Sequence, residues 1–174
     1  MKHCARWLAV VMIVTLSAAA APLAVAQRGP VDTGPGTLAA ARKILEGRWR
    51  LLTFEIIQPG QKPIPVLGAG SMVYDNFGNM TIDIRVDPPT AAMLEKVGIS
   101  TVKGSLFTQG KTAIDLQART LTFLLDGQKA LGAPSGPLAL NRKRHWQISG
   151  NVLTLTTKND DGQDVSVGRW EKAP

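Results

Sequence analysis

The chain has 174 residues, a net charge of +7, one cysteine and two histidines. One cysteine excludes a disulfide within the chain, and two histidines exclude a histidine-rich metal site. The length is enough for one domain with a sizeable core.

The N-terminal segment has the three-part layout of a secretory signal peptide. Two basic residues precede an apolar run over residues 7–16, and Ala24-Val25-Ala26 supplies the small side chains that a signal peptidase recognises. This pattern predicts a signal peptide over residues 1–26, cleavage before Gln27, and a secreted or periplasmic protein. A retained membrane anchor is the alternative, but Pro22 and the small residues around it make a poor bilayer span.

Cleavage would remove Lys2, His3, Cys4 and Arg6. The mature chain, residues 27–174, then carries 18 basic and 13 acidic residues, a net charge of +5, and no thiol. A cysteine nucleophile and thiolate metal ligands are therefore excluded, and we expect neither a metal nor a cofactor. We also expect no membrane span in the mature chain.

The mature chain begins with a segment that has little to pack. Residues 27–36 contain three glycines and two prolines, and they predict a flexible leader. Thr37 can cap a short helix over residues 38–46, which Gly47 ends. We expect the folded domain to cover residues 37–174.

From Trp49 onward, strand-like segments alternate with turn-forming residues. We predict strands near residues 48–58, 69–75, 79–87, 100–108, 111–117, 119–126, 139–149, 151–158 and 163–172. Tight turns such as Ser149-Gly150-Asn151 require antiparallel neighbours. The pattern favours an all-β fold, either a sandwich or an up-and-down barrel of about eight strands.

Two segments interrupt this succession of strands. Asp87 is followed by two prolines and can cap a short helix over residues 90–97, which Gly98 ends. Residues 129–137 are too rich in glycine and proline to join a sheet. They predict a long loop, and loops of this kind often cover a barrel cavity.

Several segments resemble the bacterial lipocalin-like domains, in the order in which that family has them. The matching segments are Gly47-Arg48-Trp49 with the Leu-Thr-Phe-Glu run after it, residues 70–80, residues 110–123, and residues 144–156 with Trp170-Glu171. The resemblance implies a closed antiparallel barrel that holds a small ligand, with the Trp49 indole across the closed end. The helix after Asp87 and the loop before Leu138 do not match the family pattern, and an unrelated barrel or sandwich is the alternative.

Strand alternation makes Glu55 a candidate for the cavity. Side chains alternate along a strand, so an inward Trp49 predicts an inward Glu55. A carboxyl group in a partly apolar cavity can serve as a polar anchor or as an acid. The alternative inward set is Arg50, Leu52, Phe54 and Ile56, with Glu55 in solvent, because a slip of one residue exchanges the two faces.

Three further residues complete the predicted ligand-binding set. Arg85 is a candidate partner for Glu55, and Asp83 shares the face of Arg85. Tyr74 could orient a ligand, although a tyrosine beside a turn often makes a structural hydrogen bond. The set is Trp49, Glu55, Tyr74, Asp83 and Arg85, and it assigns no catalytic residue. Trp146 could line the pocket or lie outside.

The sequence gives little support for hydrolase chemistry or nucleic-acid binding. His145 is the one histidine of the mature chain, and no Gly-x-Ser-x-Gly elbow surrounds any serine, which disfavours a serine hydrolase. Residues 141–145 are basic, but alternation sends Arg142 and Arg144 to one face and Lys143 to the other. This division favours a solvated strand, and we expect no nucleic-acid partner.

Three functions stay open at this point. The first is an exported binding protein for a small, mainly apolar ligand. The second is a cyclase or isomerase that uses Glu55 or Asp83 as acid or base. The third is an envelope interaction protein with a filled core, which the absence of a cavity beyond ~300 Å³ would favour.

Overall fold

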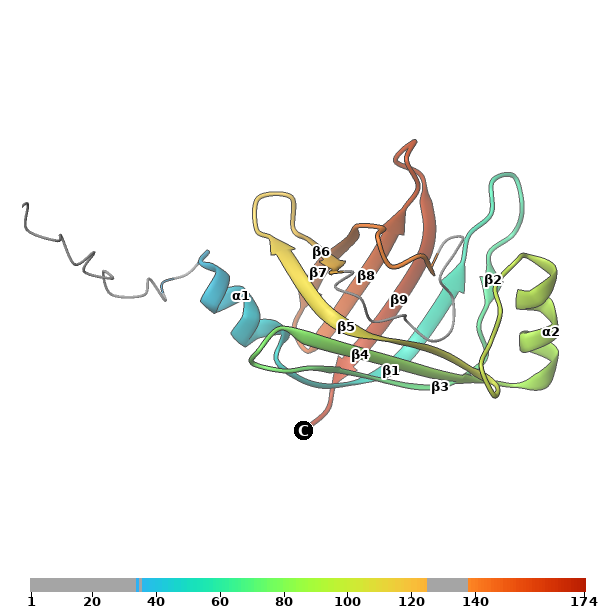
Figure 1. The fold of residues 1–174 in the computed structure, drawn as a ribbon, viewed down its shortest axis with the longest axis horizontal. Helices are drawn as coiled ribbons and strands as arrows, with labels where there is room; N and C mark the ends of the chain where they lie inside the picture. The colour runs from blue at the N-terminus through green and yellow to red at the C-terminus, as the bar shows by residue number, and fades with distance from the viewer. Residues whose placement is uncertain (1–33, 35, 125–137) are drawn as a thin grey trace, which may run out of the picture. The chain divides into compact units, whose positions relative to one another are not determined.

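The computed structural model describes residues 34, 36–124 and 138–174. The predicted signal peptide, most of the leader and the predicted loop over residues 129–137 lie outside this part of the chain. The described residues form nine strands in one antiparallel sheet (Figure 1). The strands are β1 Gly47–Ile56, β2 Ile64–Pro65, β3 Gly68–Tyr74, β4 Asn79–Val86, β5 Ser105–Asp115, β6 Thr120–Phe123, β7 Arg144–Ser149, β8 Val152–Lys158 and β9 Asp164–Lys172.

The sheet closes into a barrel because β1 pairs with β3 on one side and with β9 on the other. Around the barrel the order is β1, β3, β4, β5, β6, β7, β8 and β9, so each strand neighbours the next in the chain. The two-residue β2 pairs with the end of β1. The prediction of an up-and-down antiparallel barrel of about eight strands is confirmed.

The strands predicted over residues 100–108 and 139–149 begin five residues later, at Ser105 and Arg144, and the predicted break after residue 108 is absent. Residues 100–108 and 111–117 were expected to be two strands, but β5 continues through Gly110, which pairs with Met80 of β4. A Cβ atom at Gly110 would lie 3.3 Å from the Phe123 ring. The glycine makes room for this ring on the inner face, and it does not form a turn.

Both predicted helices are present. In α1, Leu38–Leu45, the Thr37 hydroxyl accepts a hydrogen bond from the Ala40 amide at 3.2 Å. In α2, Pro88–Lys96, the Asp87 carboxylate accepts one from the Thr90 amide at 2.7 Å. Within the described residues, no helix combines the length and the apolar character that crossing a bilayer requires.

Helix α1 packs at the end of the barrel where β1 begins. The Trp49 side chain is 2% exposed, and its indole N–H donates to the carbonyl of Leu45 at 2.8 Å. The Lys172 ammonium lies 5.2 Å from the centre of the same ring. The predicted inward orientation of Trp49 is therefore confirmed, and its indole is a packing group that ties α1 to the barrel.

The predicted inward orientation of Glu55 is wrong. The register between β1 and β9 shifts between Leu51 and Thr53, which is a β-bulge. A bulge adds one residue to one strand, so the inward set changes parity beyond it. Trp49 points inward before the bulge, and Phe54 and Ile56 are buried or half-buried after it, while Glu55 is exposed.

Candidate functional site

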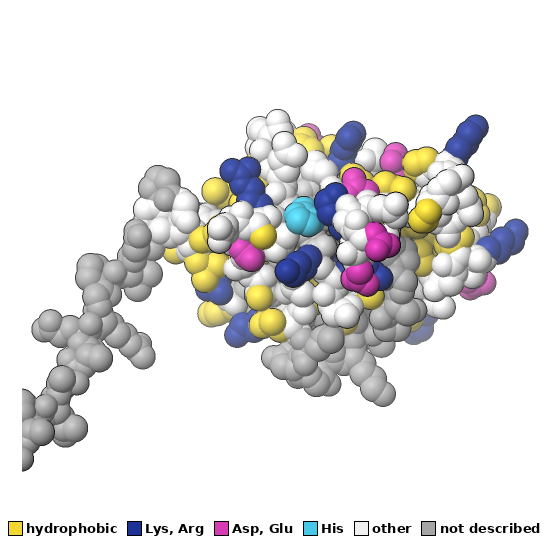
Figure 2. Space-filling view, turned by 90° about the horizontal axis from the view of Figure 1, so that it is seen from above, with side chains coloured by type: hydrophobic (Ala, Val, Ile, Leu, Met, Phe, Trp, Pro, Cys, Tyr) yellow, Lys and Arg dark blue, Asp and Glu magenta, His cyan; other side chains and the backbone are white. Residues whose placement is uncertain are grey.

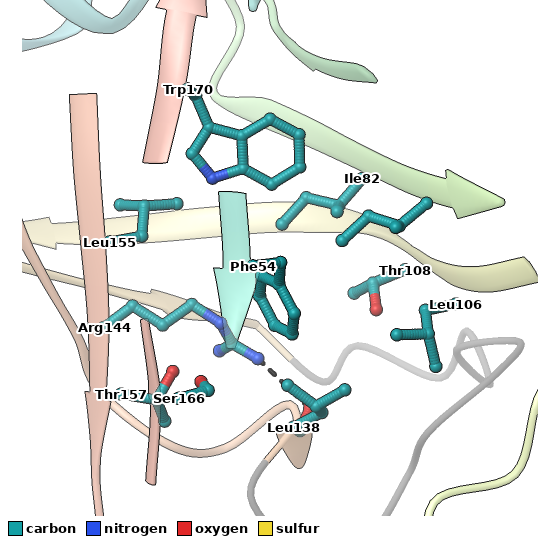
Figure 3. Close-up of a pocket in the computed structure, with 11 residues that line it drawn as sticks. Phe54, Ile82, Leu106, Thr108, Leu138, Arg144, Leu155, Thr157, Ser166 and Trp170 are labelled. Carbon is teal, nitrogen blue, oxygen red and sulfur yellow. Dashed lines mark hydrogen bonds between the residues drawn. The ribbon is translucent and has the colours of Figure 1, made fainter. Parts of the chain in front are cut away.

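The inside of the barrel contains a small cavity of about 40 Å³. Most of its described lining comes from two groups of strands (Figure 3): β1, β4 and β5 contribute mainly apolar side chains, and β7, β8 and β9 contribute most of the polar ones, while Leu138 precedes β7. The lining residues are Phe54, Ile82, Ile84, Leu106, Thr108, Leu138, Arg144, Leu155, Thr157, Ser166 and Trp170.

Strand register places three polar side chains in one row. Arg144 of β7 pairs with Thr157 of β8, which pairs with Ser166 of β9. Directly paired residues of antiparallel strands point to the same face of the sheet. Ser166 also pairs with Ile56, whose side chain is 1% exposed and belongs to the core. The row therefore faces the interior.

Arg144 is a buried cation. It is 6% exposed, and its guanidinium carbon lies 5.0 Å from the centre of the Phe123 ring. Its two terminal nitrogens donate to backbone carbonyls of the segment before β7: Arg142 at 3.0 Å, Leu138 and Ala139 at 3.2 Å, and Leu140 at 3.4 Å. Within the described part of the chain, no carboxylate forms an ion pair with it. Burial lowers the pKa of Arg144 to about 10, so it stays protonated at neutral pH.

Trp170 offers a second polar group to the cavity. Its side chain is 1% exposed, and its buried indole N–H has no hydrogen-bond partner among the described residues. Gly168 allows this packing, because a Cβ atom there would lie 2.9 Å from both the indole nitrogen and the Phe54 ring. In Figure 3 the nitrogen lies on the side of the indole that faces Phe54.

Two of the predicted site residues lie inside the barrel but away from this cavity. Trp49 packs against α1, as described above. Tyr74 is 1% exposed, and its hydroxyl lies 3.5 Å from that of Thr112, which donates to the carbonyl of Gly78 at 3.0 Å. This is the structural type of contact that the sequence analysis named as the alternative for Tyr74. Neither residue belongs to the lining of the cavity.

The other predicted residues lie on the outer face. Asp83 and Arg85 share a face, as predicted, but that face points away from the core, because the alternate residues Ile82 and Ile84 line the cavity. With Phe107, they border an outer groove of about 510 Å³. Glu55, Asp83 and Arg85 therefore do not contribute to the interior cavity. The structure does not bring the five predicted residues together.

The basic segment over residues 141–145 is divided differently from the prediction. Arg144 begins β7 and points inward, whereas Arg142 precedes the strand and lies 3.8 Å from Asp160 in an ion pair. His145 and Lys143 border an outer groove, and in Figure 2 the histidine lies among basic and acidic side chains. The burial of Arg144 was not predicted from the sequence. The available signal was its place on the same strand face as Trp146 and Ile148, both partly buried against the core.

No protein-family model matches this chain, and no curated protein sequence matches it. Among solved structures, the chain is similar to a crystal structure of a DUF4847 family protein from Bacteroides vulgatus ATCC 8482. The two share 12% sequence identity with a TM-score of 0.41, and the match covers 78% of this chain and 99% of that one.

Proposed function

We propose that this chain is an exported binding protein with a lipocalin-like barrel, which holds a small molecule in the interior cavity. The observation that carries the proposal is that three features meet at one cavity: a buried cation, an indole N–H with no hydrogen-bond partner among the described residues, and an apolar wall. Small-molecule sites in proteins combine apolar walls with a few placed polar groups in this way.

The size of the cavity limits the ligand. A volume of about 40 Å³ holds roughly three water molecules. Ligand sites for larger molecules usually measure about 300–1,000 Å³. The ligand is therefore small, or only its head group enters the barrel.

The same volume favours a second candidate, an envelope interaction protein whose core is filled. The cyclase or isomerase hypothesis requires Glu55 or Asp83 in the cavity as acid or base. Both residues lie on the outer face, so we do not propose this function. The described lining residues include donors and a fixed positive charge, but no carboxylate and no imidazole that could act as a base.

Mass spectrometry of small molecules released from protein purified from its own host distinguishes the two candidates. We expect one compound to be recovered repeatedly from the wild-type protein and to be lost from Thr108→Met, which fills the cavity. Gln109→Met is the matched control, since Gln109 is the next residue of β5 and is exposed on the outer face. Recovery of no compound from the wild-type protein would favour the filled core.

Export is tested separately. We expect the protein from the periplasm or the medium of its host to begin at Gln27, because residues 24–26 have the small side chains of a cleavage site. Intact-mass measurement of that protein gives its first residue. A full-length mass, with the protein found in the membrane fraction, would support a retained anchor instead.

A further inference from the structure

We infer that the outer face of the barrel carries a second binding site, which takes an apolar α-amino acid by both of its charged ends. The site is the β4–β5 groove, the outer groove of about 510 Å³ that Asp83, Arg85 and Phe107 border. Its whole lining lies between residues 83 and 107, a range that the structure describes without a gap. None of its lining residues borders the interior cavity, so the site is independent of the proposed function.

Strand pairing places charges of opposite sign on the floor of this groove. Asp83 and Arg85 lie on the same face of β4, two residues and therefore roughly 7 Å apart along the strand. On β5, Phe107 pairs with Asp83 and Ser105 pairs with Arg85. Directly paired residues share a face, so the groove has an acidic side beside Phe107 and a basic side beside Ser105.

Lys103 adds a second positive charge to the basic side. Residues 102–105 form a two-residue turn with Lys103 at its first central position, closed by backbone hydrogen bonds of 2.9 and 3.0 Å. The Gly104 carbonyl accepts a hydrogen bond from the Val86 amide at 2.9 Å, which holds this turn beside Arg85. Lys103 has a φ of 50°, in the left-handed region that glycine and asparagine adopt at lower cost. Turn geometry therefore does not account for a lysine at this position, whereas a role for its charge does.

These three charges are unpaired among the described residues. None of Asp83, Arg85 and Lys103 forms an ion pair or a side-chain hydrogen bond there. The Asp83 Oδ1 atom is also buried without a donor from the described residues, so part of this carboxylate has lost its hydration. Such a carboxylate gains from a nearby cation with several N–H donors, which an ammonium group provides. On the basic side, Arg85 and Lys103 offer charge-assisted hydrogen bonds to a carboxylate.

The two sides of the groove together define the class of ligand. An α-amino acid carries an ammonium group and a carboxylate on one carbon atom, so a single molecule can contact both sides. Phe107, Val86 and Val102 also line the groove and provide an apolar surface for its side chain. A compound with several negative charges would be repelled by the Asp83 carboxylate, which disfavours phosphate esters. The volume of the groove lies within the range of about 300–1,000 Å³ that is usual for small-molecule sites.

Titration of the mature protein with L-leucine, leucinamide and N-acetyl-leucine tests the site, at pH 7 and constant ionic strength. Leucine has both charges, leucinamide has only the positive one, and N-acetyl-leucine has only the negative one. We expect leucine to shift the backbone amide NMR signals of residues 83–86 and 102–107, and the two analogues to bind at least tenfold more weakly. Glycine, which has both charges but no side chain, should also bind more weakly than leucine.

Two variants separate ligand contact from folding. Asp83→Asn and Lys103→Asn should each weaken leucine binding at least tenfold, since each removes a charge that faces the ligand. Asparagine is favoured in the turn that Lys103 occupies, so Lys103→Asn should lose binding without a fall in Tm. Glu55→Gln and Lys111→Asn are the matched controls, because both residues are exposed and lie outside the groove.

Equal binding of the three leucine compounds, no binding of leucine, or full leucine binding by Asp83→Asn would overturn the inference. Thr108→Met, which fills the interior cavity, should leave leucine binding unchanged, because Thr108 lines that cavity and not the groove. Loss of leucine binding in this variant would place the amino acid inside the barrel and would also overturn the outer site. Recovery of a compound from the host protein is a separate result, so failure of one site is distinguished from failure of the other.

Discussion

Trp49→Ala is expected to lower the free energy of unfolding by about 3–5 kcal/mol, the usual cost of removing a large buried aromatic side chain. The indole is 2% exposed, and it also donates the hydrogen bond that holds the carbonyl of Leu45 at the end of α1. Its loss leaves a void at this end of the barrel and frees α1 from β1. Urea unfolding of the mature protein, followed by circular dichroism, measures the change.

Trp49→Phe is the matched control, since it keeps an aromatic ring but removes the donor to Leu45. We expect a smaller loss than for Trp49→Ala, because most of the buried area is kept. A loss below about 1 kcal/mol for Trp49→Ala would contradict the packing role and would mean that this end of the barrel collapses around the void.

The architecture could be predicted from the sequence, because the local signals for turns and helix caps agree with the topology along most of the chain. Turn glycines such as Gly78, Gly150 and Gly162 have positive φ in the structure, so the hairpins that they close fix antiparallel neighbours. Thr37 and Asp87 cap the two helices as their side chains predict. The prediction was wrong at Gly110, because the sequence does not distinguish a strand glycine that makes room for a ring from a turn glycine.

The candidate site was not predicted because its residues depend on a local irregularity and on a distant pairing. The inward residues predicted by alternation from Trp49 are correct up to Leu51. From Phe54 onward, the alternative inward set is the correct one. The bulge between them has no glycine or proline to mark it in the sequence. Because the bulge adds one residue, it reverses the alternation after it, and Glu55 lies on the surface instead of in the interior.

The case of Arg144 differs, because its strand keeps regular alternation. Arg144, Trp146 and Ile148 share the inner face of β7, and their orientation follows from the pairing with Leu155 and Thr157 of β8. From sequence, the basic residues beside Arg144 favoured a solvated strand. A charged residue within a basic segment is therefore a poor guide to burial unless the apolar residues on the same face are weighed with it.

Gly68→Ala is expected to destabilise the protein by about 3 kcal/mol, through a clash that no side-chain rotation relieves. A Cβ atom at position 68 would lie 1.8 Å from the carbonyl oxygen of Arg85, which belongs to the backbone of the paired strand β4. The strands must separate where Gly68 pairs with Val86, directly before the Asp87 cap of α2. Ala69→Ser is the matched control, since Ala69 is exposed, and we expect a change within about 0.5 kcal/mol. Urea unfolding measures the stability of both variants. Equal stability would contradict the prediction, because it would show that β3 and β4 can separate at this end without a loss of free energy.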